Sequence, residues 1–338
     1  METCKKKNII FQLGENTGKT DHIKLENNKD AFITEPISVY PSKRINSFIT
    51  KKVTEYVRVN QILDKMSTLL ENEIVLEMKR ESFELKELKK FQEAIYNYLD
   101  TDDNIIQTIV LKGSERDSIY RHSLNVAILG AIVGKWLGFS GNDIDYIIYA
   151  GILSNFGKLK IDRNIISKKG TLTRNEYNVV KTYPIAGYKF LKENTSIDDE
   201  ILKAVLMHHE REDGSGYPLG VKGQSISNIS KIIAICDVFD AANSNRDYKE
   251  KKPPFEALRV IQEEMKNGTL DKEYCCVFLE HIINLYLGQS VILNNGIFAE
   301  IVKMDKNFIE RPVVYIKEED KFIDLSLEDK LHIKALVF

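Results

Sequence analysis

The residues best suited to chemistry form one short stretch in the second half of the chain. Two adjacent histidines, His208 and His209, are followed by an acidic, glycine-containing turn that ends at Pro218. Adjacent histidines at a helix end can direct their imidazoles toward two metals, or toward a metal and a phosphate. Gly214 and Gly216 would allow backbone N–H groups to approach an anion. The stretch indicates a metal or phosphate site, although paired histidines alone would also suit a polar helix end before an ordinary turn.

Two further residues favour the metal interpretation. His122 lies in an apolar stretch that is predicted to be helical, and Asp237 directly follows the apolar run Ile232–Cys236. A carboxylate in such a helix needs a partner, because burying a lone charge is costly. A metal ion or a histidine would supply that partner. The candidate metal ligands are therefore His122, Asp237, His208 and His209.

The order of these residues along the chain resembles the HD-GYP family, a subset of the HD phosphohydrolase superfamily. The stretch His208–Pro218 is similar to the family signature. Other pieces of the family pattern follow in the same order, at Arg121–Ser123, Gly157–Lys158, Pro184–Gly187, Asp237–Ala241 and Asn245–Tyr248. The resemblance covers about residues 115–250. It implies a helical core with two or three metals, usually iron or manganese, which activate a water against a phosphodiester, typically that of cyclic di-GMP.

Three positions depart from the family pattern. Ser154 and Asn155 stand where the family has the His-Asp pair that bridges the metals, and Tyr183 stands where it has a histidine before Pro184. Asparagine is neutral and bridges two cations poorly, and a tyrosine hydroxyl with its usual pKa of about 10 is rarely ionised. We therefore expect no two-metal hydrolytic centre and no obligate cofactor. The four remaining ligands could hold one weakly bound iron or manganese ion.

The residues that the resemblance assigns to the substrate are better preserved. It implies that Lys158 and Arg246 face the phosphates, and that Lys158 acts in catalysis only if the protein is active. The same ligand site would include the turn residues Asp213, Gly214, Gly216, Tyr217 and Pro218. Lysine suits a phosphate as a point charge, and arginine can bind one with two parallel hydrogen bonds. Both cations could instead be solvated or paired with nearby aspartates.

Three functional hypotheses follow from this combination. The first is a catalytically impaired HD-GYP-like regulatory protein that binds cyclic di-GMP or a related nucleotide and signals through protein contacts. The second is a protein-interaction scaffold with no small ligand. The third is an active, metal-dependent cyclic di-GMP phosphodiesterase with an unusual site. We favour the first and lean away from an enzyme; a protein partner is expected, and a homodimer is left open.

The fold that must position these residues is predicted to be mainly α. Residues 1–104 form a mixed and then helical N-terminal region, because apolar residues recur at steps of three and four between 59 and 99. Residues 105–287 form an all-helical HD-GYP-like domain, in which Thr173 and Glu176 fit a capping box. Residues 288–338 form a small β module, with β-branched runs and a glycine turn at Asn294–Gly296.

Composition excludes several classes of protein. The 338 residues include 48 Lys plus Arg and 50 Asp plus Glu, a net charge of −2 that provides no general attraction for nucleic acid. Four cysteines without a CxxC pair exclude zinc ribbons and suggest a reducing compartment. No stretch approaches the roughly 18 apolar residues of a membrane span. We expect a cytoplasmic protein with neither nucleic-acid nor membrane partners.

Overall fold

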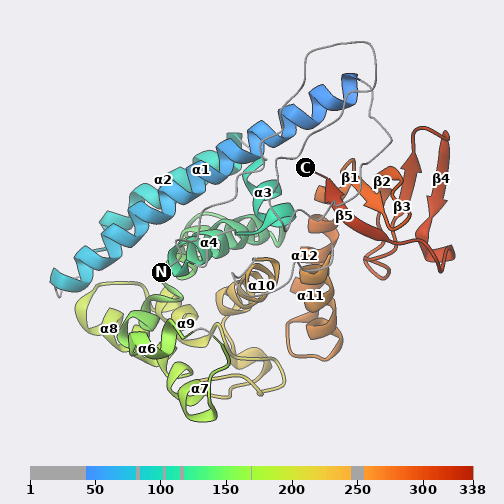
Figure 1. Cartoon of the computed structure of the whole chain (residues 1–338). Coiled ribbons are helices and arrows are strands. Elements are labelled where there is room, and N and C mark those ends of the chain that lie inside the picture. Colours follow the sequence, from blue (N-terminus) through green and yellow to red (C-terminus); the bar gives the residue numbers. More distant parts are fainter. Residues whose placement is uncertain are drawn as a thin grey trace. The chain divides into compact units, whose positions relative to one another are not determined.

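The computed structural model describes residues 43–80, 84–101, 104–114, 118–168, 170–244 and 255–337, without the side chains of residues 43–53, 80 and 101. The chain divides into two compact units, Met1–Phe48 and Ile49–Phe338. The second unit contains all the predicted site residues that are described (Figure 1). Among the helices of these ranges, none combines the length and the apolar character that crossing a bilayer requires.

The predicted N-terminal helices are present. Helices α1 (Lys43–Arg80) and α2 (Leu85–Thr101) lie in the predicted N-terminal region, while α3 (Asn104–Lys112) stands at the start of the predicted helical domain. The part predicted to be mixed, up to residue 42, lies outside the described residues. Most of the periodic apolar residues are buried or partly buried, as at Leu70 on α1 and Ile95 on α2. Helices α1 and α2 lie side by side (Figure 1), and an ion pair between Lys90 and Glu73 joins them. Amphipathic spacing therefore predicted this pair correctly.

The central domain is a set of packed helices. Its elements, in chain order, are α4 (Ile119–Trp136), α5 (Asn142–Leu153), η1 (Phe156–Lys160), α6 (Arg163–Ile166), α7 (Arg174–Val180), α8 (Tyr183–Asn194), α9 (Asp199–Met207), η2 (Gly223–Ser225), α10 (Asn228–Asn243), α11 (Glu256–Lys266), α12 (Lys272–Ile282) and η3 (Ile283–Tyr286). The capping box predicted at Thr173 and Glu176 begins α7, with both reciprocal hydrogen bonds present.

Helix α4 is the central element of this domain, as its almost uniformly apolar sequence predicted. It packs against α5 and α10, and its residues from Leu124 to Ala131 are fully buried. Helix α5 approaches it closely at Gly151, where a Cβ atom would lie 2.5 Å from the Cα of Ala127. The close packing of α4, α5 and α10 brings the candidate site residues of the three helices together.

The C-terminal residues form an antiparallel sheet in the order β4-β3-β2-β1-β5. Its strands are β1 (Ser290–Leu293), β2 (Phe298–Lys303), β3 (Val313–Ile316), β4 (Lys321–Asp324) and β5 (Ile333–Val337), with a short helical turn, η4 (Leu325–Leu327), before β5. Val291 pairs with Ala299 across the predicted hairpin. The expected β module is thus confirmed.

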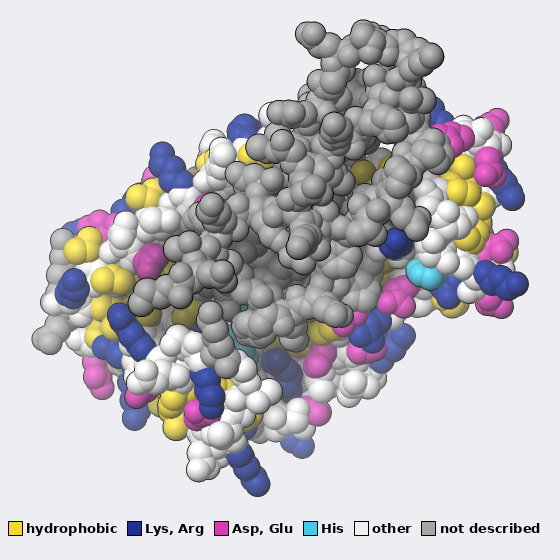
Figure 2. All heavy atoms as spheres, viewed as in Figure 1, with side chains coloured by type: hydrophobic (Ala, Val, Ile, Leu, Met, Phe, Trp, Pro, Cys, Tyr) yellow, Lys and Arg dark blue, Asp and Glu magenta, His cyan; other side chains and the backbone are white. Residues whose placement is uncertain are grey.

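The surface agrees with the balanced composition. Figure 2 shows basic and acidic side chains intermingled on the visible face of the described residues. Within the described part of the chain, Cys236, Cys275 and Cys276 are free thiols. Cys4 lies outside the described residues.

Candidate functional site

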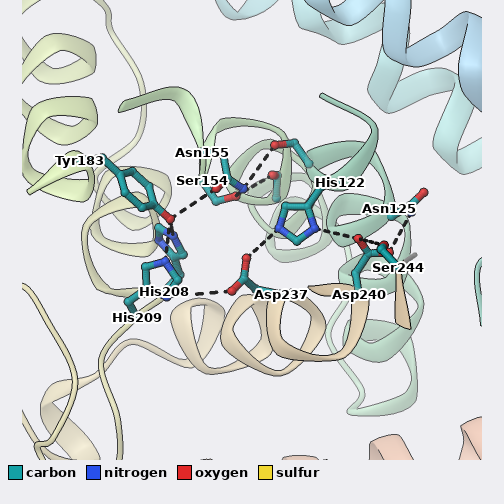
Figure 3. Close-up of polar contacts among 12 residues, drawn as sticks. His122, Asn125, Ser154, Asn155, Tyr183, His208, His209, Asp237, Asp240 and Ser244 are labelled. Atoms are coloured by element: carbon teal, nitrogen blue, oxygen red, sulfur yellow. Dashed lines mark hydrogen bonds and ion pairs between the residues drawn. The ribbon is translucent and has the colours of Figure 1, made fainter. Parts of the chain in front are cut away.

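Four elements bring the predicted metal ligands together. His122 is in the first turn of α4, Asp237 is in the middle of α10, and His208 and His209 follow the end of α9. Tyr183 is the first residue of α8. Figure 3 shows their side chains converging on one polar cluster between the helices. All five predicted positions therefore belong to a single site.

His122 lies between two carboxylates. Its Nδ1 is 2.7 Å from Oδ2 of Asp240, and its Nε2 is 2.9 Å from Oδ1 of Asp237 (Figure 3). Burial favours the neutral ring, but the hydrogen bonds and charges of the two aspartates outweigh it and raise the pKa of His122 to about 9. Burial alone would raise the pKa of Asp237, yet His122 and the other two imidazoles hold it well below its usual range. Near neutral pH this cluster is a cation between two anions.

The two signature histidines share one hydroxyl group. The Tyr183 hydroxyl oxygen is 2.8 Å from Nε2 of His208 and 2.6 Å from Nε2 of His209. Burial lowers the pKa of His208 to about 4 and that of His209 well below its ordinary value, so both rings are neutral near pH 7. Burial also raises the pKa of Tyr183, which keeps its hydroxyl protonated. Hydrogen bonds, not ionic attraction, therefore hold the three side chains.

The direction of these hydrogen bonds follows from the backbone. Nδ1 of His208 is 2.9 Å from the carbonyl oxygen of Val205, which can only accept, so Nδ1 carries the proton. Nε2 of His208 must then accept from the Tyr183 hydroxyl, whose oxygen accepts from Nε2–H of His209. Both Nε2 atoms, with which these histidines would bind a metal, face the phenol.

Ser154 and Asn155 lie beside this triad at the end of α5. The amide of Asn155 donates to the hydroxyl oxygens of Ser154, at 3.1 Å, and Ser123, at 3.4 Å, while its Oδ1 lies 3.4 Å from the Tyr183 hydroxyl. Ser154 donates to the carbonyl of Gly151. Both side chains are buried and neutral. Asn155 and Ser154 are thus hydrogen-bonded to each other, and Asn155 lies beside the Tyr183 hydroxyl.

The glycine-containing turn folds back over His209. Tyr217 stacks on the His209 ring with 4.5 Å between centroids, and the amide of Tyr217 donates to the carbonyl of His209. At Gly216 a Cβ atom would lie 2.4 Å from that carbonyl oxygen, so only glycine fits this approach. Gly214 has a positive φ of 81°, and Pro218 follows a cis peptide bond. The turn therefore lies against the site, as predicted.

The other residues predicted to bind a ligand do not all lie at the site. Lys158, in η1, holds its Nζ 5.0 Å from the centroid of the Tyr183 ring. Asp213 is exposed and accepts hydrogen bonds from the backbone and hydroxyl of Ser215, so here it stabilises the turn. Arg246 lies outside the described residues. The structure thus brings Lys158 to the site and leaves Asp213 at the surface.

Two further side chains at the site lie within the motif stretches but were not predicted to have a role there. Asp240, fully buried, is the second partner of His122, and Asn125 donates to it at 2.8 Å. Asp240 is part of the aspartate helix, three residues after Asp237, and this helical spacing was the one available clue. Glu210, also buried, accepts from the amides of Leu219, Gly220 and Val221, at 2.6, 3.2 and 3.2 Å.

The side chains present do not suit a carboxylate-bridged metal pair. The bridging position holds the neutral amide of Asn155, and the hydroxyl of Tyr183 faces both Nε2 atoms of the signature histidines. Over the described ranges, no three His, Cys, Asp or Glu side chains are grouped so that they could hold a metal ion. Two adjacent cations need shared anionic oxygen ligands, which this donor set lacks at that position.

Comparisons with known proteins agree on one family. The HD domain family matches residues 114–274. A cyclic di-GMP phosphodiesterase of Thermotoga maritima is 30% identical over 240 residues, which cover 70% of this chain and 61% of that protein. A cyclic di-GMP phosphodiesterase of Pseudomonas aeruginosa is 28% identical over 63% of this chain and 51% of its own length. The chain thus spans between half and two thirds of these two relatives.

A solved structure supports the fold. Bd1817, described as an HDG"Y"P protein from Bdellovibrio bacteriovorus, superposes with a TM-score of 0.53 at 12% identity, covering 82% of this chain and 95% of that one. Such low identity supports the architecture alone. Together with the ordered motifs, it supports an HD-GYP-like fold for residues 114–274, the part of this chain that matches the HD domain family.

Proposed function

We propose that this chain is a regulatory HD-GYP-like protein that binds cyclic di-GMP or a related cyclic dinucleotide without hydrolysing it, and signals through contacts with a protein partner. The observation that carries the proposal is the Tyr183 hydroxyl held between Nε2 of His208 and Nε2 of His209. In this arrangement the protein itself supplies the partner that these rings would otherwise find in a metal.

The loss of hydrolysis follows from the charge of the site. Metal-dependent hydrolysis of a phosphodiester needs bound cations that lower the pKa of a water and neutralise the phosphate oxygens. At the position that the family resemblance assigns to the metal bridge, this chain has the neutral amide of Asn155, and the Tyr183 hydroxyl lies against Nε2 of both signature histidines. A metal ion would have to displace this hydroxyl and would find no anionic bridge there, which disfavours metal binding.

The binding of an anionic nucleotide is supported by the cations around the tyrosines. Lys158 lies over the Tyr183 ring, and Lys181 lies 5.4 Å from the centroid of Tyr217. Lys181 also lies 5.3 Å from the centroid of the Tyr177 ring. A lysine beside an aromatic ring can serve both a phosphate and a base, because the ring stacks on the base while the ammonium group binds the phosphate.

An active cyclic di-GMP phosphodiesterase is the second candidate. The relatives that match the sequence carry that activity in their names. His122, His208, His209 and Asp237 remain close together, with Nδ1 of His209 3.9 Å from Oδ2 of Asp237. If the phenol of Tyr183 moved aside, these four side chains could surround one metal ion. A scaffold without a small ligand is the third candidate.

One experiment separates the three functions. The protein is purified without oxygen, its iron and manganese are quantified by mass spectrometry, and the same sample is titrated with cyclic di-GMP in a calorimeter. We expect little metal, saturable binding and no linear product after prolonged incubation. About one or more metals per chain together with product would establish the phosphodiesterase. If the sample contains no metal and binds no cyclic di-GMP, the scaffold function remains.

Variants of the lysines then locate the binding site. Lys158→Ala and Lys181→Ala should each weaken the affinity about tenfold, as expected for the loss of one charge-assisted phosphate contact. Lys189→Ala removes an exposed lysine of α8 and is the matched control. Binding that is saturable but equal in all three variants would move the ligand away from this site.

A further inference from the structure

A buried arginine connects the N-terminal helix α1 to the site. The side chain of Arg121, next to His122 on α4, is 1% exposed. Its Nη1 donates to Oδ1 of Asp64 at 2.7 Å and its Nη2 to Oδ1 of Asn60 at 2.8 Å. Asp64 and Asn60 are one turn apart on α1. The guanidinium therefore holds α1 against α4 through two directed hydrogen bonds.

The same guanidinium begins a chain of hydrogen bonds that ends at His122. Its Nε donates to Oδ1 of Asn125 at 3.1 Å, one turn further along α4. The amide of Asn125 donates in turn to Oδ1 of Asp240 at 2.8 Å, and Oδ2 of Asp240 pairs with His122 (Figure 3). Because Asn125 accepts with its oxygen and donates with its nitrogen, the amide has one orientation that satisfies both neighbours.

Each residue in this series of hydrogen bonds is held in place by the next one. Arg121, Asn125 and Asp240 are all buried, so water cannot replace a lost partner easily. A buried guanidinium that loses its carboxylate must find another one. Asp240 is the other carboxylate whose charge acts on Arg121. Removal of Asp64 would therefore draw Arg121 toward Asp240 and weaken the hold of Asp240 on His122.

We propose that Asp64 and Arg121 are positioning residues: the contact between them, which joins α1 to α4, sets the geometry of His122 and Asp237, and hence the affinity of the site for its nucleotide. The proposal rests on the nucleotide-binding function proposed above and adds how that site is regulated. Coupling between two sites is reciprocal. A nucleotide that changes the pairing of His122 must therefore change the strength of the Asp64–Arg121 contact on α1, which gives the bound state a route to a protein partner.

The test compares two ways of loosening α1. Asp64→Asn keeps the size of the side chain and removes the charge that Arg121 needs. Leu70→Ala removes a fully buried apolar contact of the same helix that takes no part in the hydrogen-bond chain. Asp64→Glu restores the carboxylate. Arg58→Ala removes an exposed α1 ion pair, that with Glu55, and controls for surface charge.

Three measurements are made on each full-length variant. Hydrogen exchange reports the protection of α1, calorimetry reports cyclic di-GMP affinity, and the ¹⁵N resonances of the His122 ring report its hydrogen bonds without any ligand. Asp64→Asn should shift the His122 resonances and weaken the affinity about five- to twentyfold, within the usual range of coupling. Asp64→Glu should recover most of both. Leu70→Ala should lower α1 protection yet leave the His122 resonances unmoved and the affinity within about twofold.

The outcomes separate this inference from the proposed function. Unmoved His122 resonances in Asp64→Asn, or equal losses of affinity in Asp64→Asn and Leu70→Ala, would overturn the coupling while leaving nucleotide binding intact. If the wild-type protein binds no cyclic di-GMP but Asp64→Asn still shifts the His122 resonances, the connection between Asp64 and His122 is retained and the proposed function is rejected. If Asp64→Asn does not fold, Asn60→Ala tests the same connection with a smaller change.

Discussion

The Tyr183 hydroxyl and Nε2 of His208 lie 2.8 Å apart in the interior of the domain, and the hydroxyl is the donor. The same oxygen accepts from His209 at 2.6 Å. Tyr183 therefore satisfies both members of the histidine pair that the sequence presents as metal ligands.

Removal of the Tyr183 hydroxyl should destabilise the protein. Tyr183→Phe leaves a buried acceptor on His208 and a buried donor on His209 without their partner, at a cost of about 1–3 kcal/mol in the free energy of unfolding. Urea unfolding measures the difference. Tyr188→Phe on the same helix is the control, because its hydroxyl accepts from an exposed lysine, Lys192. Equal stabilities of the two variants would show that the hydroxyl does not bridge the histidines.

Restoration of the family ligands should create a metal site. The triple variant Ser154→His, Asn155→Asp, Tyr183→His supplies an anionic bridge and two more imidazoles, and it removes the phenol that now faces His208 and His209. We expect about two iron or manganese ions per chain by mass spectrometry, and slow conversion of cyclic di-GMP to its linear product by chromatography.

The double variant Ser154→His, Tyr183→His is the matched control for that experiment. It retains Asn155 and lacks the bridge, so it should bind less metal and form no product. Metal uptake and turnover in the unmodified protein would instead contradict the premise that the three replacements prevent hydrolysis.

Stability should decrease as the solution is made alkaline. The pKa of His122 rises from 6.5 to about 9 on folding, so its stabilising contribution is complete below about pH 6.5 and disappears as the pH rises through 9. At about 1.4 kcal/mol for each pKa unit, up to roughly 3 kcal/mol is lost. Urea midpoints at pH 7 and pH 9.5 measure this loss, which should be much smaller in His122→Gln. A decrease of the same size in that variant would assign it to other groups.

The stability of the turn that follows His209 should depend on Glu210. Its carboxylate accepts three backbone N–H groups, from Leu219, Gly220 and Val221, in a buried position. Glu210→Gln directs amide hydrogens at some of these donors and should cost about 1–3 kcal/mol of stability. Glu200→Gln, which removes an exposed ion pair with Lys203, should cost under about 1 kcal/mol. Thermal unfolding of both variants provides the comparison, and equal shifts would deny Glu210 this role.

The local features of the fold could be predicted from the sequence because each depends on residues a few positions apart. Apolar spacing predicted the buried faces of α1 and α2, the Thr173–Glu176 pair predicted the start of α7, and the turn after Leu293 predicted the first hairpin. The ordered motifs likewise indicated which side chains would meet, since His122, His208, His209 and Asp237 come together as expected.

Only the tertiary structure decided how those side chains pair. Spacing gives no sign that Tyr183 lies between His208 and His209, or that Arg121 reaches Asp64 on α1. Each of these contacts joins residues from different elements, and its geometry depends on how α8 packs against α9, how α4 packs against α10, and how α1 lies against α4. The identity of the site residues is thus a property of the sequence. Their partners and charges are a property of the packing, because burial and neighbouring groups shift their pKa values.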